Sequence, residues 1–301
     1  MKEIYVEKQF RQSSLELIAL MNSVIENYSE QGYSLTLRQL YYQLVARDLI
    51  ANNEKSYNKI GNLVSDGRLA GLIDWSGIVD RTRRVTSLNH YENPQEIINL
   101  ASSWYRNDMW ENQDYYVEVW VEKEALSDIV GQASERFDVP YFSCRGYVSQ
   151  SAMYQASLRF IDKQEEGKHC VLIYLGDHDP SGIDMGRDIQ ERLDIFRVDQ
   201  DIFDFRRVAL SMDQIAEFNP PPNPAKLSDS RANGYIKKYG YNSWELDALE
   251  PSVITELIVT EIESLLDKYQ YNKILNKVAE EKRVMKKVSE DWKNVYSNYL
   301  W

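Results

Sequence analysis

Residues 169–182 read HCVLIYLGDHDPSG, an apolar run that ends in acidic residues and continues into Pro-Ser-Gly. Residues 115–122, YYVEVWVE, follow the same plan and end in Glu122. Apolar runs of this length fit buried strands, and the helical stretches between them fit the crossovers of a mainly parallel sheet. Ligands of such a sheet bind at the carboxyl ends of its strands. The two acidic strand ends therefore indicate a site.

The same alternation continues on both sides of these strands. Strand-like runs at 115–122, 139–144, 169–177 and 205–210 alternate with helical stretches at 124–137, 149–164 and 182–196. This order predicts an α/β domain over residues 115–215, with helices on both faces of the sheet. Cys144 and Cys170 fall in the apolar runs, where a reduced thiol packs as a small hydrophobic group.

The N-terminal third has helical periodicity instead. Apolar residues recur at helical spacing in residues 14–28, 37–50 and 56–69, and Thr36 is the expected N-cap of the second helix. Residues 71–85, GLIDWSGIVDRTRRV, alternate enough to form a small hairpin. Three short helices and a hairpin predict a winged helix over residues 1–90. Some domains of this fold bind DNA, and others only contact other proteins.

The remaining segments connect or extend these domains. Residues 91–114 are polar and irregular, and they predict a linker with one short helix. Residues 217–231 hold a proline cluster, which excludes a regular helix or a central strand. Helical patterns follow, the last one heavily charged. We expect residues 216–301 to form a proline-containing strap and a helical C-terminal region that serves dimerisation or a partner.

Composition limits the function classes. Hydrophobic residues make up 43% and charged residues 27% of 301, as in globular proteins. No apolar run reaches the roughly 20 residues that span a bilayer, and the first residues lack the apolar core of a signal peptide. We expect a cytoplasmic protein with no membrane partner. Three scattered histidines lack the spacing of zinc ligands.

The charge distribution indicates where DNA would bind. A net charge of −12 argues against nonspecific coating of nucleic acid, which needs positive potential. Residues 38–84 reverse the balance, with eight basic and five acidic residues. We expect DNA contacts to start there, with Lys55, Lys59, Arg68, Arg81 and Arg83 as candidates. For Lys55, Lys59 and Arg68 an ordinary solvated face is an equal alternative.

Three carboxylates end the two central strands. Glu122 ends the first, and Asp177 and Asp179 face the same way at the end of the second, because residues i and i+2 of an extended segment share a side. Three hard oxygen donors suit Mg²⁺, which keeps several waters, and Mn²⁺ accepts the same donors. Without a cation these acids would repel one another. The alternative is turn and cap chemistry.

A Glu that ends one strand and an Asp-x-Asp-Pro-x-Gly that ends a later one resemble the Toprim domain of topoisomerases, primases and some nucleases. An Arg-x-x-x-Tyr precedes them, and this order over roughly residues 34–210 is similar to the topoisomerase VI A subunit and its relatives that make meiotic double-strand breaks. The resemblance implies a winged-helix domain, a Rossmann-like Toprim domain and a homodimer. It also implies a tyrosine that attacks a DNA phosphate to form a 5′-phosphotyrosyl link, assisted by the Toprim metal of the partner subunit.

The matching tyrosine lies in the segment Arg38-Gln39-Leu40-Tyr41-Tyr42. Tyr41 shares the apolar face of its helix, whereas Tyr42 lies four residues from Arg38 and is expected on the outward face with it. The expected nucleophile is therefore Tyr42. Arg38 would hold the scissile phosphate and Glu122 would act with the metal. The alternative is that Tyr42 only packs its helix.

The chain departs from that family in two respects. It has no GHKL-type ATPase region, so strand passage would need a separate ATPase or regulatory subunit. Residues 244–249, WELDAL, match no motif. Glu245 and Asp247 are expected in surface salt bridges, and the alternative is that they approach the metal.

The expected function is Mg²⁺-dependent DNA cleavage by transesterification through Tyr42. One alternative is a Toprim nuclease of a defence or mobile-element system, which would use the same acids to activate water and leave the tyrosine idle. A second alternative is a noncatalytic DNA-binding or assembly protein.

Overall fold

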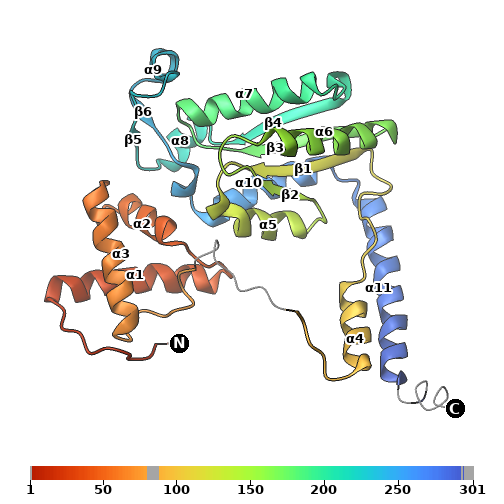
Figure 1. The fold of residues 1–301 in the computed structure, drawn as a ribbon, viewed down its shortest axis with the longest axis horizontal. Coiled ribbons are helices and arrows are strands. Elements are labelled where there is room, and N and C mark those ends of the chain that lie inside the picture. The colour runs from red at the N-terminus through yellow and green to blue at the C-terminus, as the bar shows by residue number, and fades with distance from the viewer. Residues whose placement is uncertain (1, 80–87, 293, 295–301) are drawn as a thin grey trace.

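The computed structural model describes residues 2–79, 88–292 and 294. Within this part a helical N-terminal unit and an arm of two helices, one short and one long, extend from the same side of an α/β unit (Figure 1). The N-terminal unit contains α1 (Gln12–Glu30), α2 (Leu37–Ala46) and α3 (Glu54–Leu69). The chain is therefore mixed α/β, as its sequence predicts.

The α/β unit is built on a parallel four-stranded sheet. Its strand order is β2-β1-β3-β4, with β1 at Tyr115–Val121, β2 at Tyr141–Ser143, β3 at His169–Leu175 and β4 at Phe203–Ala209. The central strands β1 and β3 pair from Tyr115 with His169 to Val121 with Leu175. Because the two strands end in register, the residues that follow them emerge side by side.

Helices cover both faces of this sheet (Figure 1). Alternate β1 residues point to opposite faces, and Val119 joins one core cluster while Trp120 joins the other. The first cluster includes side chains of α5 (Ser127–Glu135) and α10 (Pro251–Leu265), and the second includes side chains of α6 (Gln150–Glu165) and α7 (Pro180–Ile195). The buried thiols of Cys144 and Cys170 are free and belong to the second cluster, as predicted.

The N-terminal helices lie where their periodicity predicts them. Thr36 caps α2 with a capping box, in which its side chain accepts the Gln39 N–H and the Gln39 side chain accepts the Thr36 N–H. Of the segment predicted to form a hairpin, residues 80–85 lie outside the described ranges. Residues 71–79 contain no strand, and Ile78 forms a single parallel bridge with Leu35.

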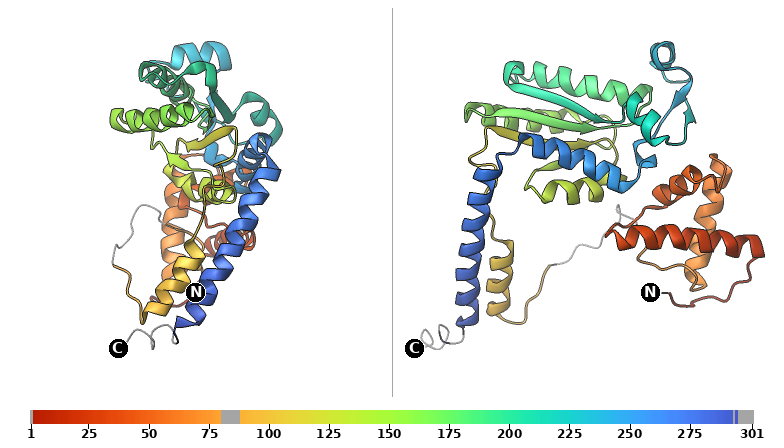
Figure 2. Two further views of the ribbon diagram at one scale, coloured as in Figure 1. Left: turned by 90° about the vertical axis from the view of Figure 1, so that its right-hand side faces the viewer. Right: turned by 180° about the vertical axis from the view of Figure 1, so that it is seen from behind.

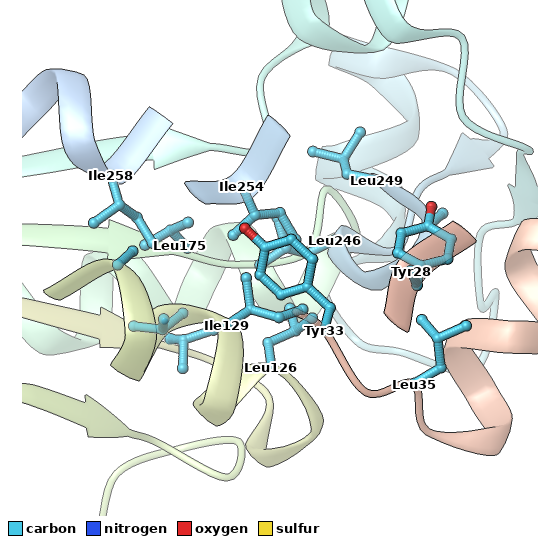
Figure 3. Close-up of a cluster of buried hydrophobic side chains, with 14 of the residues drawn as sticks. Tyr28, Tyr33, Leu35, Leu126, Ile129, Leu175, Leu246, Leu249, Ile254 and Ile258 are labelled. Atoms are coloured by element: carbon cyan, nitrogen blue, oxygen red, sulfur yellow. The ribbon is translucent and has the colours of Figure 1, made fainter. Parts of the chain in front are cut away.

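A shared hydrophobic cluster holds the N-terminal unit against the α/β unit (Figure 3). Tyr28, Tyr33 and Leu35 come from the N-terminal unit, and Tyr33 lies beside Leu246 and Ile254. The Tyr33 hydroxyl adds a buried hydrogen bond of 3.1 Å to Thr255 Oγ1. Apolar burial of this kind fixes how α2 approaches the strand ends.

The segment after β4 wraps around the carboxyl ends of the strands. It contains α8 (Met212–Phe218), the short antiparallel pair β5 (Asn223–Pro224) and β6 (Asn242–Ser243), α9 (Ala232–Tyr239) and the 3₁₀ turn η3 (Leu246–Ala248). We call residues 219–231 the proline strap. The following α10 packs into the sheet core, where Ile254, Ile258 and Ile262 are fully buried. The C-terminal region therefore contributes to the α/β layer.

Two helices far apart in sequence form a projecting arm. The predicted linker helix is α4 (Pro94–Trp104), and it lies alongside the charged helix α11 (Lys268–Glu290) in every view (Figures 1 and 2). Tyr105 donates a hydrogen bond to Glu281, and Lys282 donates one to the Ser103 carbonyl.

No helix in the described ranges is long and apolar enough to cross a membrane.

Candidate functional site

Glu122 and Asp177 meet at the carboxyl ends of β1 and β3. The Glu122 N–H donates to the Leu175 carbonyl at 2.9 Å, which continues the strand pairing by one residue. The Asp177 N–H in turn donates to Glu122 Oε2 at 2.9 Å. Both side chains are buried, and burial raises the pKa of both carboxyl groups. The two acidic strand ends therefore meet in the structure.

Both carboxylate oxygens of Asp177 have partners. Oδ1 accepts the Leu246 N–H at 2.7 Å, and Oδ2 lies 2.9 Å from the Lys123 ammonium. Leu246 comes from η3, almost seventy residues further along the chain. Asp177 thus ties the α/β sheet to the turn that follows β6.

Asp179 has a different role from the other two acids. It is the N-cap of α7, and its Oδ1 accepts the Gly182 N–H at 2.6 Å and the Ser181 hydroxyl at 2.9 Å. This is the cap chemistry that the sequence offered as the alternative to metal binding. Of the three predicted ligands, Glu122 and Asp177 are joined by a hydrogen bond from the Asp177 backbone N–H, and besides burial the charge of Asp179 contributes to the raised pKa of Glu122.

Arg207 and His178 hold the loop that carries these acids, and sequence reasoning missed both. The Arg207 guanidinium donates to the carbonyl oxygens of Gly176, Asp177 and Gly182 at 3.1, 2.6 and 2.9 Å. His178 pairs through its backbone with Trp244 in both directions, each at 2.9 Å. Arg207 had no detectable signal, because it lies in an ordinary strand.

The His178 ring sits in an aromatic cage. Its Nδ1 lies 2.8 Å from the Tyr235 hydroxyl, and the rings of Tyr235, Tyr239 and Trp244 surround it. Burial, followed by the positive charge of Arg207, lowers the pKa of His178 to about 4. A neutral imidazole therefore anchors the acidic loop to α9 and β6.

An ion cluster connects this loop to the N-terminal unit. The Lys123 ammonium contacts Glu245 and lies 3.0 Å from Asp247 Oδ1. Arg38 of α2 lies 2.8 Å from Glu245 and 3.2 Å from Asp247 Oδ2. The Asp247 side chain is fully buried and Glu245 is 23% exposed. The expected salt bridges of these two acids are therefore present, but the expected surface position of Asp247 is wrong, because η3 lies against α2.

Tyr42 lies beside Arg38, but it is not on an outward face. Its side chain is buried, because Asn223 of β5 covers it and donates from Nδ2 to the hydroxyl at 3.5 Å. Burial, followed by Glu245 and Asp247, raises the pKa of the Tyr42 hydroxyl. The Arg38 guanidinium lies 5.8 Å from the centre of the Tyr42 ring. The predicted pairing with Arg38 is present, and the predicted exposure is wrong.

Tyr41 and Tyr42 line one cavity with Arg38. Its volume is about 450 Å³, and its other lining residues are Asn52, Asn53, Glu54, Tyr57, Asn223 and Pro224. The Tyr41 hydroxyl donates to Asn52 Oδ1 at 2.9 Å. Asn52 also binds the strap, donating to the Pro222 carbonyl at 3.1 Å. The strap therefore closes one side of the cavity.

The predicted DNA contacts separate into three groups. Lys55 and Lys59 are exposed on α3 and line a surface hollow of about 590 Å³. Arg68 is half-buried and donates to the carbonyl oxygens of Trp75 and Ile78, so it secures the chain after α3 instead of facing solvent. Arg81 and Arg83 lie outside the described residues.

The donors at the strand ends fit a hard cation only in part. In the described ranges no three His, Cys, Asp or Glu side chains are arranged to hold a metal ion. Besides burial, the charge of Glu122 nevertheless raises the pKa of Asp177, so the two carboxylates lie near enough to interact, and among the described residues the buried Tyr174 hydroxyl has no hydrogen-bond partner. Mg²⁺ prefers such oxygen donors. A Cβ at either Gly176 or Gly182 would lie 3.0 Å from Glu122 Oε2. The two glycines therefore keep side-chain carbons away from the Glu122 carboxylate, and Glu122 and Asp177 are the residues that would hold a cation at these strand ends.

Comparison with models of protein families and with curated protein sequences gave no match.

Proposed function

We propose that this protein cleaves DNA strands in a Mg²⁺-dependent reaction, with Tyr42 as the nucleophile, in the manner of a topoisomerase VI A subunit. One observation carries the proposal: Arg38 of α2 and Lys123 next to Glu122 share the carboxylates Glu245 and Asp247. This sharing puts the Arg-x-x-x-Tyr helix against the acidic strand ends, although the two segments lie about eighty residues apart in the sequence.

The proposal assigns a separate task to each residue. Tyr42 Oη would form a bond to phosphorus while the bond to the 3′ oxygen breaks, so the tyrosine proton is lost and the 3′ oxygen gains one. Arg38 would bind the scissile phosphate with its planar guanidinium, which matches two phosphate oxygens. To do so, it must exchange Glu245 and Asp247 for the phosphate. The charge of Arg38 also opposes the rise in the pKa of Tyr42.

Glu122 and Asp177 are the residues that would hold the divalent cation. When bound, the cation supplies positive charge that stabilises the phosphate in the transition state. Asp179 keeps the helix cap and sets the direction of α7. Arg207 and His178 position the loop by binding its backbone.

As part of the proposal, a homodimer would present two such sites to one duplex, with α1 to α3 in its winged-helix domain and the α/β unit as its Toprim domain. The resemblance implies that Tyr42 of one subunit would use the metal of the partner subunit, and the contact of Arg38 with Glu245 and Asp247 would then be exchanged for a contact across the dimer.

A hydrolytic nuclease is the second candidate, and the burial of Tyr42 favours it. A phenol that is buried, covered by Asn223 and raised in pKa is a weak nucleophile until the strap moves. Water attack at the same carboxylates would need no such movement. The products would then have free ends and no attached protein.

Cleavage itself is tested by incubating the full chain with supercoiled DNA and Mg²⁺ or Mn²⁺. We expect nicked or linear DNA with the natural sequence and none with Glu122→Gln, which keeps the size of the side chain but loses its charge. Glu124→Gln is the matched control, because Glu124 pairs with the exposed Arg145 and has no contact with Asp177. If Glu122→Gln cleaves as fast as the natural sequence, the proposed site is wrong.

A further inference from the structure

Lys123 is a cation inside the site to which the proposed function assigns a metal. Its side chain is 16% exposed, and its ammonium contacts Asp177, Glu245 and Asp247 together. These three acids surround the ammonium with the opposite charge that its partly buried position needs. Its position follows from the chain, because it comes directly after Glu122 at the end of β1.

The ammonium uses the oxygen that a metal would need. Leu246 N–H already occupies Asp177 Oδ1, so Oδ2 is the more available donor of that carboxylate. Lys123 lies 2.9 Å from Oδ2. A divalent cation that binds Asp177 Oδ2 and Glu122 would stand close to the ammonium, and like charges at such distances repel strongly in a partly buried site. Metal and ammonium therefore compete for one oxygen.

Two further carboxylates can keep Lys123 in place when it leaves Asp177. Asp247 Oδ1 lies 3.0 Å from the ammonium and Glu245 contacts it directly. Both acids act on Asp177 through their charge, which adds to burial in raising its pKa, whereas Asp177 Oδ1 and Oδ2 bind the Leu246 N–H and Lys123. Glu245 and Asp247 are thus placed to hold the lysine without holding the metal.

We propose that Lys123 is a resident counter-ion which neutralises Asp177 when no metal is bound, and that Glu245 and Asp247 retain it when a divalent cation takes Asp177. Asp247 is then a positioning residue that acts on the metal through Lys123. This inference rests on the metal site of the proposed function and goes beyond it, since it predicts how neighbouring charges set metal affinity.

The inference predicts opposite effects for the two partners of one ion pair. Lys123→Met removes the competitor, so the protein should bind Mn²⁺ about tenfold more tightly. Asp247→Asn deprives the lysine of one alternative partner, so binding should weaken by about tenfold. In the Lys123→Met background, Asp247→Asn should change the affinity by less than about twofold, because the lysine through which it acts is gone.

The test is a titration of the full-length protein with Mn²⁺ alone. The electron paramagnetic resonance signal of the free ion measures how much Mn²⁺ is bound. Lys123→Arg keeps the charge and is the control, with an affinity close to that of the natural sequence. Thermal unfolding of each variant identifies any that fail to fold. If Lys123→Met does not fold, Lys123→Gln replaces it, with the same expected direction.

Weaker Mn²⁺ binding by folded Lys123→Met would overturn the inference, because the lysine would then support the site instead of competing for it. The inference would also be overturned if Asp247→Asn lowered the Mn²⁺ affinity equally with and without Lys123, since Asp247 would then act on the metal directly. The absence of Mn²⁺ binding in every protein would reject the metal site as well. The predicted pattern without any DNA cleavage would reject the proposed function alone.

Discussion

Arg38 Nε lies 3.2 Å from Asp247 Oδ2, and this contact joins a helix of the N-terminal unit to a turn next to the carboxyl ends of the sheet. The same carboxylate lies 3.0 Å from Lys123 through its other oxygen. Asp247 is therefore the buried group that both cations share. No sequence motif marks it.

Removing the Asp247 carboxylate should lower stability. Its side chain is fully buried between two cations, and a buried charge that loses its partner costs about 3 kcal/mol. We expect Asp247→Ala to reduce the free energy of unfolding in urea by about this amount. The control is Glu250→Ala, whose exposed side chain lies 3.8 Å from Arg47 and should change stability by less than about 0.5 kcal/mol. Equal effects of the two variants would contradict the buried position of Asp247.

His178 should make the protein less stable in mild acid. Its pKa is lowered from 6.5 to about 4 by burial, so between these values the unfolded chain binds a proton that the folded chain does not. The contribution of His178 to the free energy of unfolding is therefore fully present above pH 6.5, and it is lost as the pH falls toward 4. Urea unfolding should show about 2 kcal/mol of this loss between pH 7 and pH 4.5.

The contribution of His178 is isolated by comparing variants, because Glu122 and Asp177 titrate with the opposite sign. Their raised pKa values make the folded state bind protons more readily than the unfolded state. His178→Asn should have a shallower fall in stability over the same pH range than the natural sequence. His90→Asn changes an exposed histidine and should leave the fall unaltered. If His178→Asn loses as much stability over this pH range as the natural sequence, the prediction is contradicted.

Gly182 should not tolerate a side chain. A Cβ there would lie 2.3 Å from the Asp177 carbonyl oxygen and 3.0 Å from Glu122 Oε2, so backbone at the strand end would have to shift. Gly182→Ala should lower stability by about 1 to 3 kcal/mol and reduce DNA cleavage. Gly234→Ala in α9 meets no atom within 4 Å and is the matched control, with stability unchanged or slightly raised. Thermal unfolding and the cleavage assay measure both variants.

Lys55 and Lys59 should contribute to DNA binding through phosphates. Replacing both by Ala should weaken duplex binding for all sequences alike and reduce the dependence of log affinity on log salt by about 2. The control changes Lys273 and Lys277 to Ala on α11, an equal loss of charge outside the N-terminal unit. Fluorescence anisotropy at several salt concentrations measures both. If both double variants change the affinity and its salt dependence equally, Lys55 and Lys59 make no special contact with DNA.

The elements that follow local patterns were predictable from the sequence. The runs at 115–122 and 169–177 are strands because they are apolar and bounded by turn residues, and their acids lie at one sheet edge because parallel strands end together. The helix caps at Thr36 and Asp179 are equally local. These features needed no knowledge of the tertiary structure.

Contacts between distant segments were not predictable. Tyr42 is buried because Asn223 lies over it, 181 residues further along the chain. Asp247 is buried because η3 packs under α2, which no periodicity in residues 244–249 indicates. The same holds for Lys123, whose role depends on three acids from two separate segments. Burial of each group reflects the path of the chain after β4.

The most direct test of the central claim is to trap the covalent product. The full chain is incubated with supercoiled DNA and Mg²⁺ or Mn²⁺, stopped with SDS, and analysed with and without protease, alongside Tyr42→Phe. The control is Tyr41→Phe, which removes the neighbouring hydroxyl from its bonds with Asn52 and Asn53. We predict 5′ ends that stay attached to protein until protease is added, formed by the natural sequence and by Tyr41→Phe but not by Tyr42→Phe. Free ends produced by Tyr42→Phe at the natural rate would contradict the account and identify a hydrolytic nuclease.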